Sequence, residues 1–226
     1  MKVLIEPILD FFIPRFCSAC KSKLPADTEF ICKECFSKIK RAEKERIIFE
    51  FRKKFESTGI ISDFTSHFLF EKDKVIQQII HALKYEKRFL LGIFLGKLLG
   101  ETIAKNFSAY SIDYITPIPL HHLKKAEREF NQSYYIAKGI STITGIKIND
   151  GLLKRIRYTE SQTGMILIER DKNVNGAFAA RKNLEGENIL IVDDITTTGA
   201  TMRECGRVLL NAGAGNIFGA SIAIAD

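Results

Sequence analysis

Two kinds of hydrophobic pattern run along this chain, and together they predict an α/β fold. Segments 189–192 and 216–225 are continuous or nearly continuous apolar runs, which are typical of strands buried on both faces of a parallel sheet. Shorter apolar segments at 64–70 and 114–120 predict two further strands.

Helical patterns fill the intervals between the predicted strands. Apolar residues recur three and four positions apart over 72–85, and a second apolar helix is expected over 90–105. Further helices are predicted over 132–144 and 201–211. The alternation predicts a doubly wound domain, in which helices flank a parallel sheet.

A polar segment with candidate chemistry follows the strand at 189–192. Two carboxylates, Asp193 and Asp194, come directly after the apolar run. In an open α/β sheet, ligands bind beyond the carboxyl ends of the strands, where a loop entering a helix can offer N–H groups to phosphate. The carboxylates are placed to accept ribose hydroxyls or to hold a hydrated divalent cation. The segment therefore predicts a ribose 5-phosphate site, and its loop is formed by Thr196, Thr197, Thr198, Gly199, Ala200 and Thr201.

Other nucleotide sites fit the sequence poorly. A P-loop needs G-x-x-x-x-G-K-[ST], and the nearest segment, 92–97, has the wrong spacing and no Ser or Thr. Gly213, Gly215 and Gly219 lack the spacing of a dinucleotide fingerprint and precede a strand instead of following one. A purely structural strand–turn–helix is the alternative that stays open.

Four cysteines near the N-terminus have the spacing of metal ligands. Cys17 and Cys20 form one C-x-x-C pair, and Cys32 and Cys35 form another. Two such knuckles complete a tetrahedral four-cysteine site for Zn²⁺, whose closed shell would stabilise a small module and leave no position for catalysis. Disulfides and an iron site are the alternatives, and disulfides are disfavoured in a cytoplasmic protein.

Charge patterning divides the chain into two expected units. Residues 33–54 are crowded with charges of both signs, which is typical of a solvated helix face or a linker. Ser57-Thr58-Gly59 closes this segment. We therefore predict an N-terminal segment and cysteine-containing module at 1–58, followed by a main domain at 59–226.

The composition adds a weak indication of an anionic partner. The 226 residues include 34 basic and 27 acidic side chains, and the net charge of +7 fits a phosphate ester or a nucleic acid. No apolar run approaches the roughly 20 residues that span a bilayer, and the N-terminus does not have the pattern of a secretory signal. We expect a cytoplasmic protein, and docking of the first dozen residues on a partner or on the inner face of the membrane stays open.

A first basic cluster follows the helix predicted over 72–85. A tyrosine flanked by cations can stack a base of single-stranded nucleic acid. The alternative is that these cations only complement the helix dipole. The nucleic-acid candidates are Lys84, Tyr85, Lys87 and Arg88.

A second basic cluster follows the strand predicted over 114–120. Two prolines fix the exit of that strand, and the segment beyond them is expected to be a loop. Lys124, Lys125 and Arg128 on this loop would face a diphosphate across the cleft, since neutralising a diphosphate takes two or more cations. A solvated, charged helix face is the alternative.

The segment 193–201 resembles the phosphoribosyl diphosphate (PRPP) motif of type I phosphoribosyltransferases: two acids, a hydrophobic residue, then T-T-T-G-A-T. The resemblance implies that Asp193 and Asp194 hold the ribose hydroxyls, that the loop wraps the 5-phosphate, and that Mg²⁺ accompanies the diphosphate. Thr197 stands where hypoxanthine-guanine enzymes carry an acid that acts on the base, which argues against purine salvage of that kind.

The order of motifs along the whole chain is similar to that of the ComF family, whose members join a four-cysteine zinc finger to a phosphoribosyltransferase-like domain. Beyond the cysteines, the matching motifs are P-x-P-L-H, F-N-Q, R-x-T-x-x-Q at 157–162, Arg170, Asn173, the segment 176–178 and the PRPP loop. The resemblance implies a cytoplasmic factor of natural competence that handles single-stranded DNA after uptake, with competence-machinery proteins as partners. Glu129 departs from the family, which usually has glycine there.

Three hypotheses for function follow from these patterns. The first is a DNA-handling competence protein that binds PRPP without much turnover. The second is an active phosphoribosyltransferase whose acceptor is unknown, in which the second basic cluster would stabilise the leaving diphosphate. The third is a zinc-finger adaptor with a vestigial PRPP pocket. The sequence identifies no residue that would activate an acceptor.

Overall fold

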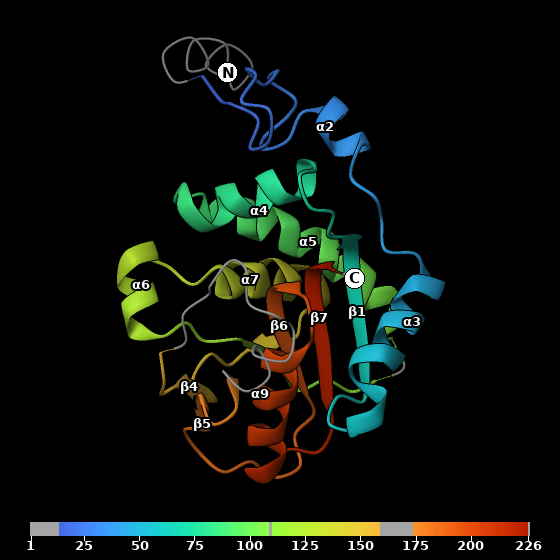
Figure 1. Cartoon of the computed structure of the whole chain (residues 1–226), viewed down its shortest axis with the longest axis vertical. Coiled ribbons are helices and arrows are strands. Elements are labelled where there is room, and N and C mark those ends of the chain that lie inside the picture. The colour runs from blue at the N-terminus through green and yellow to red at the C-terminus, as the bar shows by residue number, and fades with distance from the viewer. Residues whose placement is uncertain (1–13, 109, 159–173, 226) are drawn as a thin grey trace.

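The computed structural model describes residues 14–108, 110–158 and 174–225. Its centre is a parallel sheet of five strands, which lies between layers of helices (Figure 1). The strand order is β1-β7-β6-β2-β3, and every pairing between neighbours is parallel. The predicted α/β fold is thereby confirmed. The strands of this sheet are β1 (Asp63–Leu69), β2 (Tyr114–Pro117), β3 (Lys147–Ile148), β6 (Ile189–Thr196) and β7 (Ile217–Ile224). A separate antiparallel pair is formed by β4 (Leu153–Arg155) and β5 (Phe178–Ala180).

Helices cover both faces of this sheet. The helices are α2 (Lys33–Ser37), α3 (Lys44–Lys54), the 3-10 helix η1 (Glu56–Thr58), α4 (Val75–Tyr85), α5 (Phe89–Asn106), α6 (His122–Arg128), α7 (Gln132–Thr144) and α9 (Ala200–Asn211). Along β6, Leu190 and Val192 join the core beneath α4, α5 and α7, whereas Ile189 and Ile191 join the core beneath α3 and α9. This two-sided burial explains why the strand is a continuous apolar run. Within the described ranges, no helix is long and apolar enough to span a membrane.

Two elements differ from the sequence-based expectation. The predicted loop that carries Lys124 and Arg128 begins with a helix, α6, because residues 122–128 contain good helix formers and neither glycine nor proline. Strand β6 continues past Val192 to Thr196, since its pairing with β7 extends to Thr196 and Ile224. Both acids therefore lie on the last part of a strand and not in the loop after it.

Close contact between α5 and α7 fixes the position of α7 against the sheet. A Cβ added at Gly139 would lie 2.2 Å from the backbone oxygen of Ile93 and 2.7 Å from the Cα of Gly96. A Cβ at Gly96 would lie 2.1 Å from the backbone oxygen of Ile136. Glycine is therefore required on both helices, because backbone atoms cannot yield as a flexible side chain would.

We expect Gly139→Ala to lower the free energy of unfolding by at least about 3 kcal/mol, because the added methyl group overlaps backbone atoms of α5. Urea denaturation would measure the change. Gly151→Ala is the matched control, since its Cβ would meet only the side-chain oxygen of Asn149 at 3.4 Å and should change stability by less than about 0.5 kcal/mol. A Gly139→Ala protein as stable as the wild type would contradict the close packing of these helices.

The N-terminal part of the chain packs against the sheet domain in two places. The cysteine module, residues 14–39, lies at one end of the molecule beyond α4 and α5 (Figure 1) and shares a hydrophobic core with them. Its Phe30 ring lies 5.4 Å from that of Phe94 on α5. Farther along, α3 packs on the other face, and the fully buried Phe55 contacts Phe64 at 5.2 Å between ring centroids. The proposed domain boundary at 58/59 stays a prediction.

Candidate functional site

The two acids at the end of β6 are held by backbone and side-chain donors. The Oδ1 atom of Asp193 accepts hydrogen bonds from the hydroxyl of Ser133 (3.1 Å) and from the backbone N–H of Asp194 (2.9 Å). Ser133 lies in the first turn of α7, which Asn131 caps by accepting from the Ser133 N–H at 3.1 Å. The F-N-Q motif thus sets the start of the helix that supports the first acid. Sequence reasoning missed Ser133.

Burial and the neighbouring carboxylate of Asp194 raise the pKa of Asp193 to about 7. Two carboxylates this close repel each other when both are ionised, and burial leaves little water to screen the repulsion. A nearby cation or hydroxyl donors would relieve the repulsion. The pair is therefore suited to a ligand that brings hydroxyl groups and a divalent cation together.

Asp194 is engaged on both carboxylate oxygens. Its Oδ1 accepts from the backbone N–H of Ile195 (2.8 Å), and its Oδ2 lies 2.7 Å from Nζ of Lys84 at the end of α4. Only 11% of the Asp194 side chain is exposed, so this ion pair is largely withdrawn from solvent. The structure thereby brings Lys84, a nucleic-acid candidate from the sequence, to the predicted ribose site.

The loop after β6 forms a small cup that leads into α9. Gly199 is the N-cap of α9 and has a φ of +77°, a conformation that glycine adopts without strain. Among the described residues, the buried Thr196 hydroxyl oxygen has no hydrogen-bond partner. The cup has a volume of about 30 Å³ and is lined by Asp193, Ile195, Thr196, Thr197, Thr198, Gly199, Ala200, Thr201 and Met202. The six predicted loop residues therefore surround one cavity.

Arg203 supports this loop from behind. Its Nη1 donates to the carbonyl oxygens of Thr198 (2.8 Å) and Lys54 (2.6 Å). The Phe55 ring fills the space beside Gly199, where a Cβ would lie 2.7 Å from the ring. Helix α3, which precedes the sheet in sequence, thus braces the loop.

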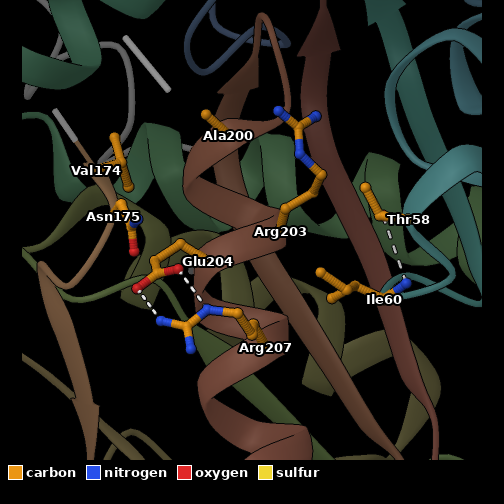
Figure 2. Close-up of a pocket in the computed structure, with 8 residues that line it drawn as sticks. All are labelled: Thr58, Ile60, Val174, Asn175, Ala200, Arg203, Glu204 and Arg207. Atoms are coloured by element: carbon orange, nitrogen blue, oxygen red, sulfur yellow. Dashed lines mark hydrogen bonds and ion pairs between the residues drawn. The ribbon is translucent and has the colours of Figure 1, made fainter. Parts of the chain in front are cut away.

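A wider pocket lies on the outer side of α9 (Figure 2), with Arg203 at its upper end. Below it, Glu204 and Arg207 form a two-point ion pair across the pocket floor, with distances of 2.7 and 2.9 Å. The volume is about 260 Å³, and the lining residues are Thr58, Ile60, Val174, Asn175, Ala200, Arg203, Glu204 and Arg207. Its charged side chains pair within the protein, so we interpret it as a structural feature behind the loop.

Basic side chains gather near the acids from separate elements. Burial lowers the pKa of Lys124, and the positive charges of Arg155 and Arg128 lower it further, so these three cations lie within electrostatic range of one another. Arg155 also feels the charge of Asp193. Arg155 was not among the predicted site residues, because it follows no motif and reaches the site through the β4–β5 pair. The side chain of Lys125 lies outside the described part of the structure, as do most of the motifs at 157–173.

The remaining nucleic-acid candidates are dispersed. Tyr85 is 53% exposed, with the Arg128 guanidinium 5.3 Å from its ring centroid. Lys87 pairs with Glu129, and Arg88 is turned to the cysteine module. Glu129 has a φ of +65°, the left-handed conformation that glycine would adopt freely. The family's glycine at this position therefore has a conformational reason, and the role of this surface in nucleic-acid binding stays a prediction.

The four N-terminal cysteines converge as the sequence predicts. Their Sγ atoms all lie within 4.8 Å of one another, and those of Cys20 and Cys32 are 3.8 Å apart. Four thiolates around Zn²⁺ at about 2.3 Å would be separated by about 3.8 Å, so the cluster fits the ion. Within the described part of the chain none of these cysteines forms a disulfide, and the backbone N–H of Cys32 donates to Sγ of Cys17 at 3.4 Å. The cluster can hold a metal such as zinc.

Comparison with known proteins gives the class of the main domain. The family model described as "Phosphoribosyl transferase domain" matches residues 131–225, which include the start of α7, both acids and the loop. Among solved structures, an adenine phosphoribosyltransferase has 18% identity and a TM-score of 0.40, covering 66% of this chain and 75% of that chain. A glutamine PRPP amidotransferase from B. subtilis has 27% identity and a TM-score of 0.38, covering 55% and 25%. These TM-scores are low, and the class rests on the family match and the strand order.

Curated relatives extend the comparison to most of the chain. Competence protein F from Haemophilus influenzae is 25% identical over 141 residues (60% of this chain, 62% of that protein), and DNA utilization protein YhgH from Escherichia coli K12 is 29% identical over 142 residues (62% and 63%). Competence protein ComFC from Bacillus subtilis is 23% identical over 215 residues (88% and 79%). This chain thus spans less than two thirds of the length of the first two. These matches support membership of the ComF family, as the order of motifs predicts.

Proposed function

We propose that this protein binds PRPP together with Mg²⁺ at the carboxyl end of β6 and acts in DNA handling during natural competence. The observation that carries the proposal is the convergence of a partly buried acid pair, a hydroxyl-lined cup and a group of cations at one edge of the sheet. PRPP has a 5-phosphate, a ribose diol and a diphosphate in that order, and each part has a chemically matched partner.

Each group of residues has a distinct part in this binding. The loop 196–201 and the start of α9 would bind the 5-phosphate through N–H groups and hydroxyls. Asp193 and Asp194 would accept the ribose hydroxyls. Carboxylates and diphosphate oxygens are the ligands that Mg²⁺ prefers, and the raised pKa of Asp193 marks a carboxylate pair whose repulsion a cation would relieve. The ion would neutralise part of the diphosphate charge, and Lys124, Arg128 and Arg155 would neutralise more of it.

Titration calorimetry of the zinc-loaded protein with PRPP and Mg²⁺ tests the proposal. We expect saturable binding that is at least about tenfold weaker for ribose 5-phosphate, because that ligand lacks the diphosphate. The absence of binding by calorimetry and by an orthogonal fluorescence assay would overturn the proposal and favour an adaptor with a vestigial pocket.

The DNA-handling part of the proposal draws on the names of the relatives, two of which are competence proteins and one a DNA utilization protein. Exposed Tyr85 beside Arg128 and the excess of basic residues suit single-stranded DNA, and a cytoplasmic location suits DNA after uptake. Binding to an oligonucleotide should weaken steeply as salt rises. If the affinity for the oligonucleotide is the same at low and high salt, the basic side chains of this surface do not bind the DNA backbone.

Catalytic transfer is the second candidate, favoured by the cations near the acid pair. In that reaction the bond from the anomeric carbon to the diphosphate oxygen breaks, the diphosphate leaves with the electron pair, and an acceptor forms the new bond. Diphosphate release that depends on an added acceptor would identify this activity.

A further inference from the structure

The cysteine module is attached to the sheet domain through the residues that follow the last turn of α4. Lys21 of the module pairs with Glu86 at 2.5 Å. Arg88 donates from Nη1 to the Phe16 carbonyl (2.9 Å) and to the Ser18 hydroxyl (3.1 Å). Ser18 is completely buried and lies between two cysteines of the cluster, so the shape of the metal-binding knuckle determines where Arg88 finds its partners.

The same end of α4 contacts the acid pair. Lys84 lies two residues before Glu86, and its Nζ lies 2.7 Å from Oδ2 of Asp194. The two side chains are only 23% and 11% exposed. The positive charge of Lys84 also reaches Asp193 and Lys124, so it lies within the group of charges that surrounds the predicted ligand. A short segment, 84–88, therefore has one end at the ligand site and the other at the cysteine module.

The ion pair between Lys84 and Asp194 obstructs any ligand whose hydroxyl groups donate hydrogen bonds to Asp194. One oxygen of that carboxylate accepts from the backbone and the other lies in the ion pair, so a ligand hydroxyl that approaches Oδ2 competes with Lys84 for it. Separating a largely buried ammonium group from its carboxylate partner is strongly destabilising unless another anion takes the place of the carboxylate. Lysine has a compact charge on a flexible stem, which can turn to a new anionic partner nearby. The diphosphate of PRPP would supply such a partner, whereas ribose 5-phosphate would not.

We infer that Lys84 makes the site selective for ligands that carry an anomeric diphosphate, and that the cysteine module positions Lys84 through Arg88. The inference rests on the proposed PRPP function and deepens it. In the free protein Lys84 forms an ion pair with Asp194, and in the complex it binds the diphosphate of the ligand. A sugar phosphate without the diphosphate has to break the ion pair without replacing it. The cysteine module then helps to position a residue of the ligand site and is not functionally independent of the sheet domain.

Calorimetry on full-length, zinc-loaded Lys84→Met tests the first part. Methionine keeps an unbranched apolar stem and removes the charge. We expect PRPP–Mg²⁺ affinity to fall roughly tenfold to hundredfold and ribose 5-phosphate affinity to stay equal or rise, so that the ratio of the two affinities collapses. Lys84→Arg should restore part of the ratio. Lys74→Met, an exposed position at the other end of α4, is the control and should leave the ratio unchanged.

Arg88→Met tests the positioning by the module. We expect the same ratio to fall at least about threefold with zinc content unchanged, because the segment between α4 and α5, which begins directly after Lys84 and Tyr85, loses two hydrogen bonds to the module. Arg88→Lys should recover part of it. Lys40→Met is the matched control, since it removes another ion pair, with Glu71, between the N-terminal part and the sheet domain.

The outcomes separate the two proposals. Failure of the wild type to bind PRPP overturns the proposed function and this inference together. Wild-type binding with an unchanged ratio in Lys84→Met overturns only the role of Lys84. If the ratio of PRPP affinity to ribose 5-phosphate affinity collapses in Lys84→Met but stays normal in Arg88→Met, the cysteine module does not position Lys84.

Discussion

Replacing Asp193 and Asp194 together by asparagine should weaken PRPP–Mg²⁺ binding by at least about a hundredfold and remove most of the loss of stability that the free protein shows between pH 5 and pH 8. The loss of binding follows because neutral amides are weaker acceptors for ribose hydroxyls and do not attract a cation. The flatter pH profile follows because asparagine does not ionise, so the cost of charging Asp193 beside Asp194 disappears. A pair of residues kept only for packing would not show these two effects together.

The stability of the free wild-type protein should fall as the pH rises, because Asp193 resists ionisation in the folded state. The pKa of Asp193 is raised from the ordinary 3.8 to about 7, first by burial and then by Asp194. Folding is therefore favoured by the protonated form below pH 4, and this contribution is lost as the pH rises toward 7 and beyond. Between pH 5 and pH 8 the wild type should lose about 1 to 3 kcal/mol more stability than the double variant, in which Lys84 lacks its ion-pair partner at every pH. Wild-type affinity for PRPP should rise over the same interval.

Thermal unfolding from pH 5 to pH 8, with calorimetric titration of the same samples, measures both effects. Asp113→Asn is the matched control, because it removes an exposed acid just before β2, at the opposite edge of the sheet. It should change neither PRPP affinity nor the pH profile. If the double variant binds PRPP normally, the ligand site does not lie at the end of β6.

The hydrophobic pattern within a segment was sufficient to predict most of the strands and helices. The apolar run 189–192 and the closing run 216–225 lie in β6 and β7, and the 3.6-residue period placed α4, α5 and α7 within a few residues. The cysteine spacing predicted a cluster because a knuckle is a local turn. Where local signals compete, prediction was wrong: prolines suggested a loop after β2, but the residues beyond them form helix α6.

The site contacts depend on tertiary packing, which spacing along the chain does not encode. Lys84 lies more than a hundred residues before Asp194, and no pattern in the sequence indicated that the fold would place the two side chains together. Ser133 and Arg203 reach the site only because α7 and α9 start there. One signal was available in the sequence, since F-N-Q followed by Ser predicts a helix start whose first hydroxyl faces the ligand edge.

Removal of the metal should unfold the cysteine module and disturb the sheet domain beneath it. The segment between the cysteine pairs has few apolar residues, so thiolate–zinc bonds would supply most of its stability; structural zinc typically contributes roughly 10 to 16 kcal/mol in peptides at neutral pH. Buried residues of the module, such as Leu24 and Ile31, share a core with α4 and α5. Loss of the module would expose that core.

Cys32→Ser, or treatment of the wild type with a chelator, should therefore lose bound zinc, become open to protease cleavage within residues 14–39, and lower the melting temperature by several degrees. Metal analysis, limited proteolysis and calorimetry would measure the three effects. The matched control is Cys205→Ala, because Cys205 is buried on α9 and distant in sequence from the cluster; it should keep its zinc and its resistance to protease. If Cys32→Ser keeps an intact, protease-resistant module without metal, packing on α4 and α5 is enough to fold it, and zinc is not its structural core. If the module unfolds and PRPP affinity falls with it, the metal acts on the ligand site through the end of α4, where Arg88 and Lys84 lie.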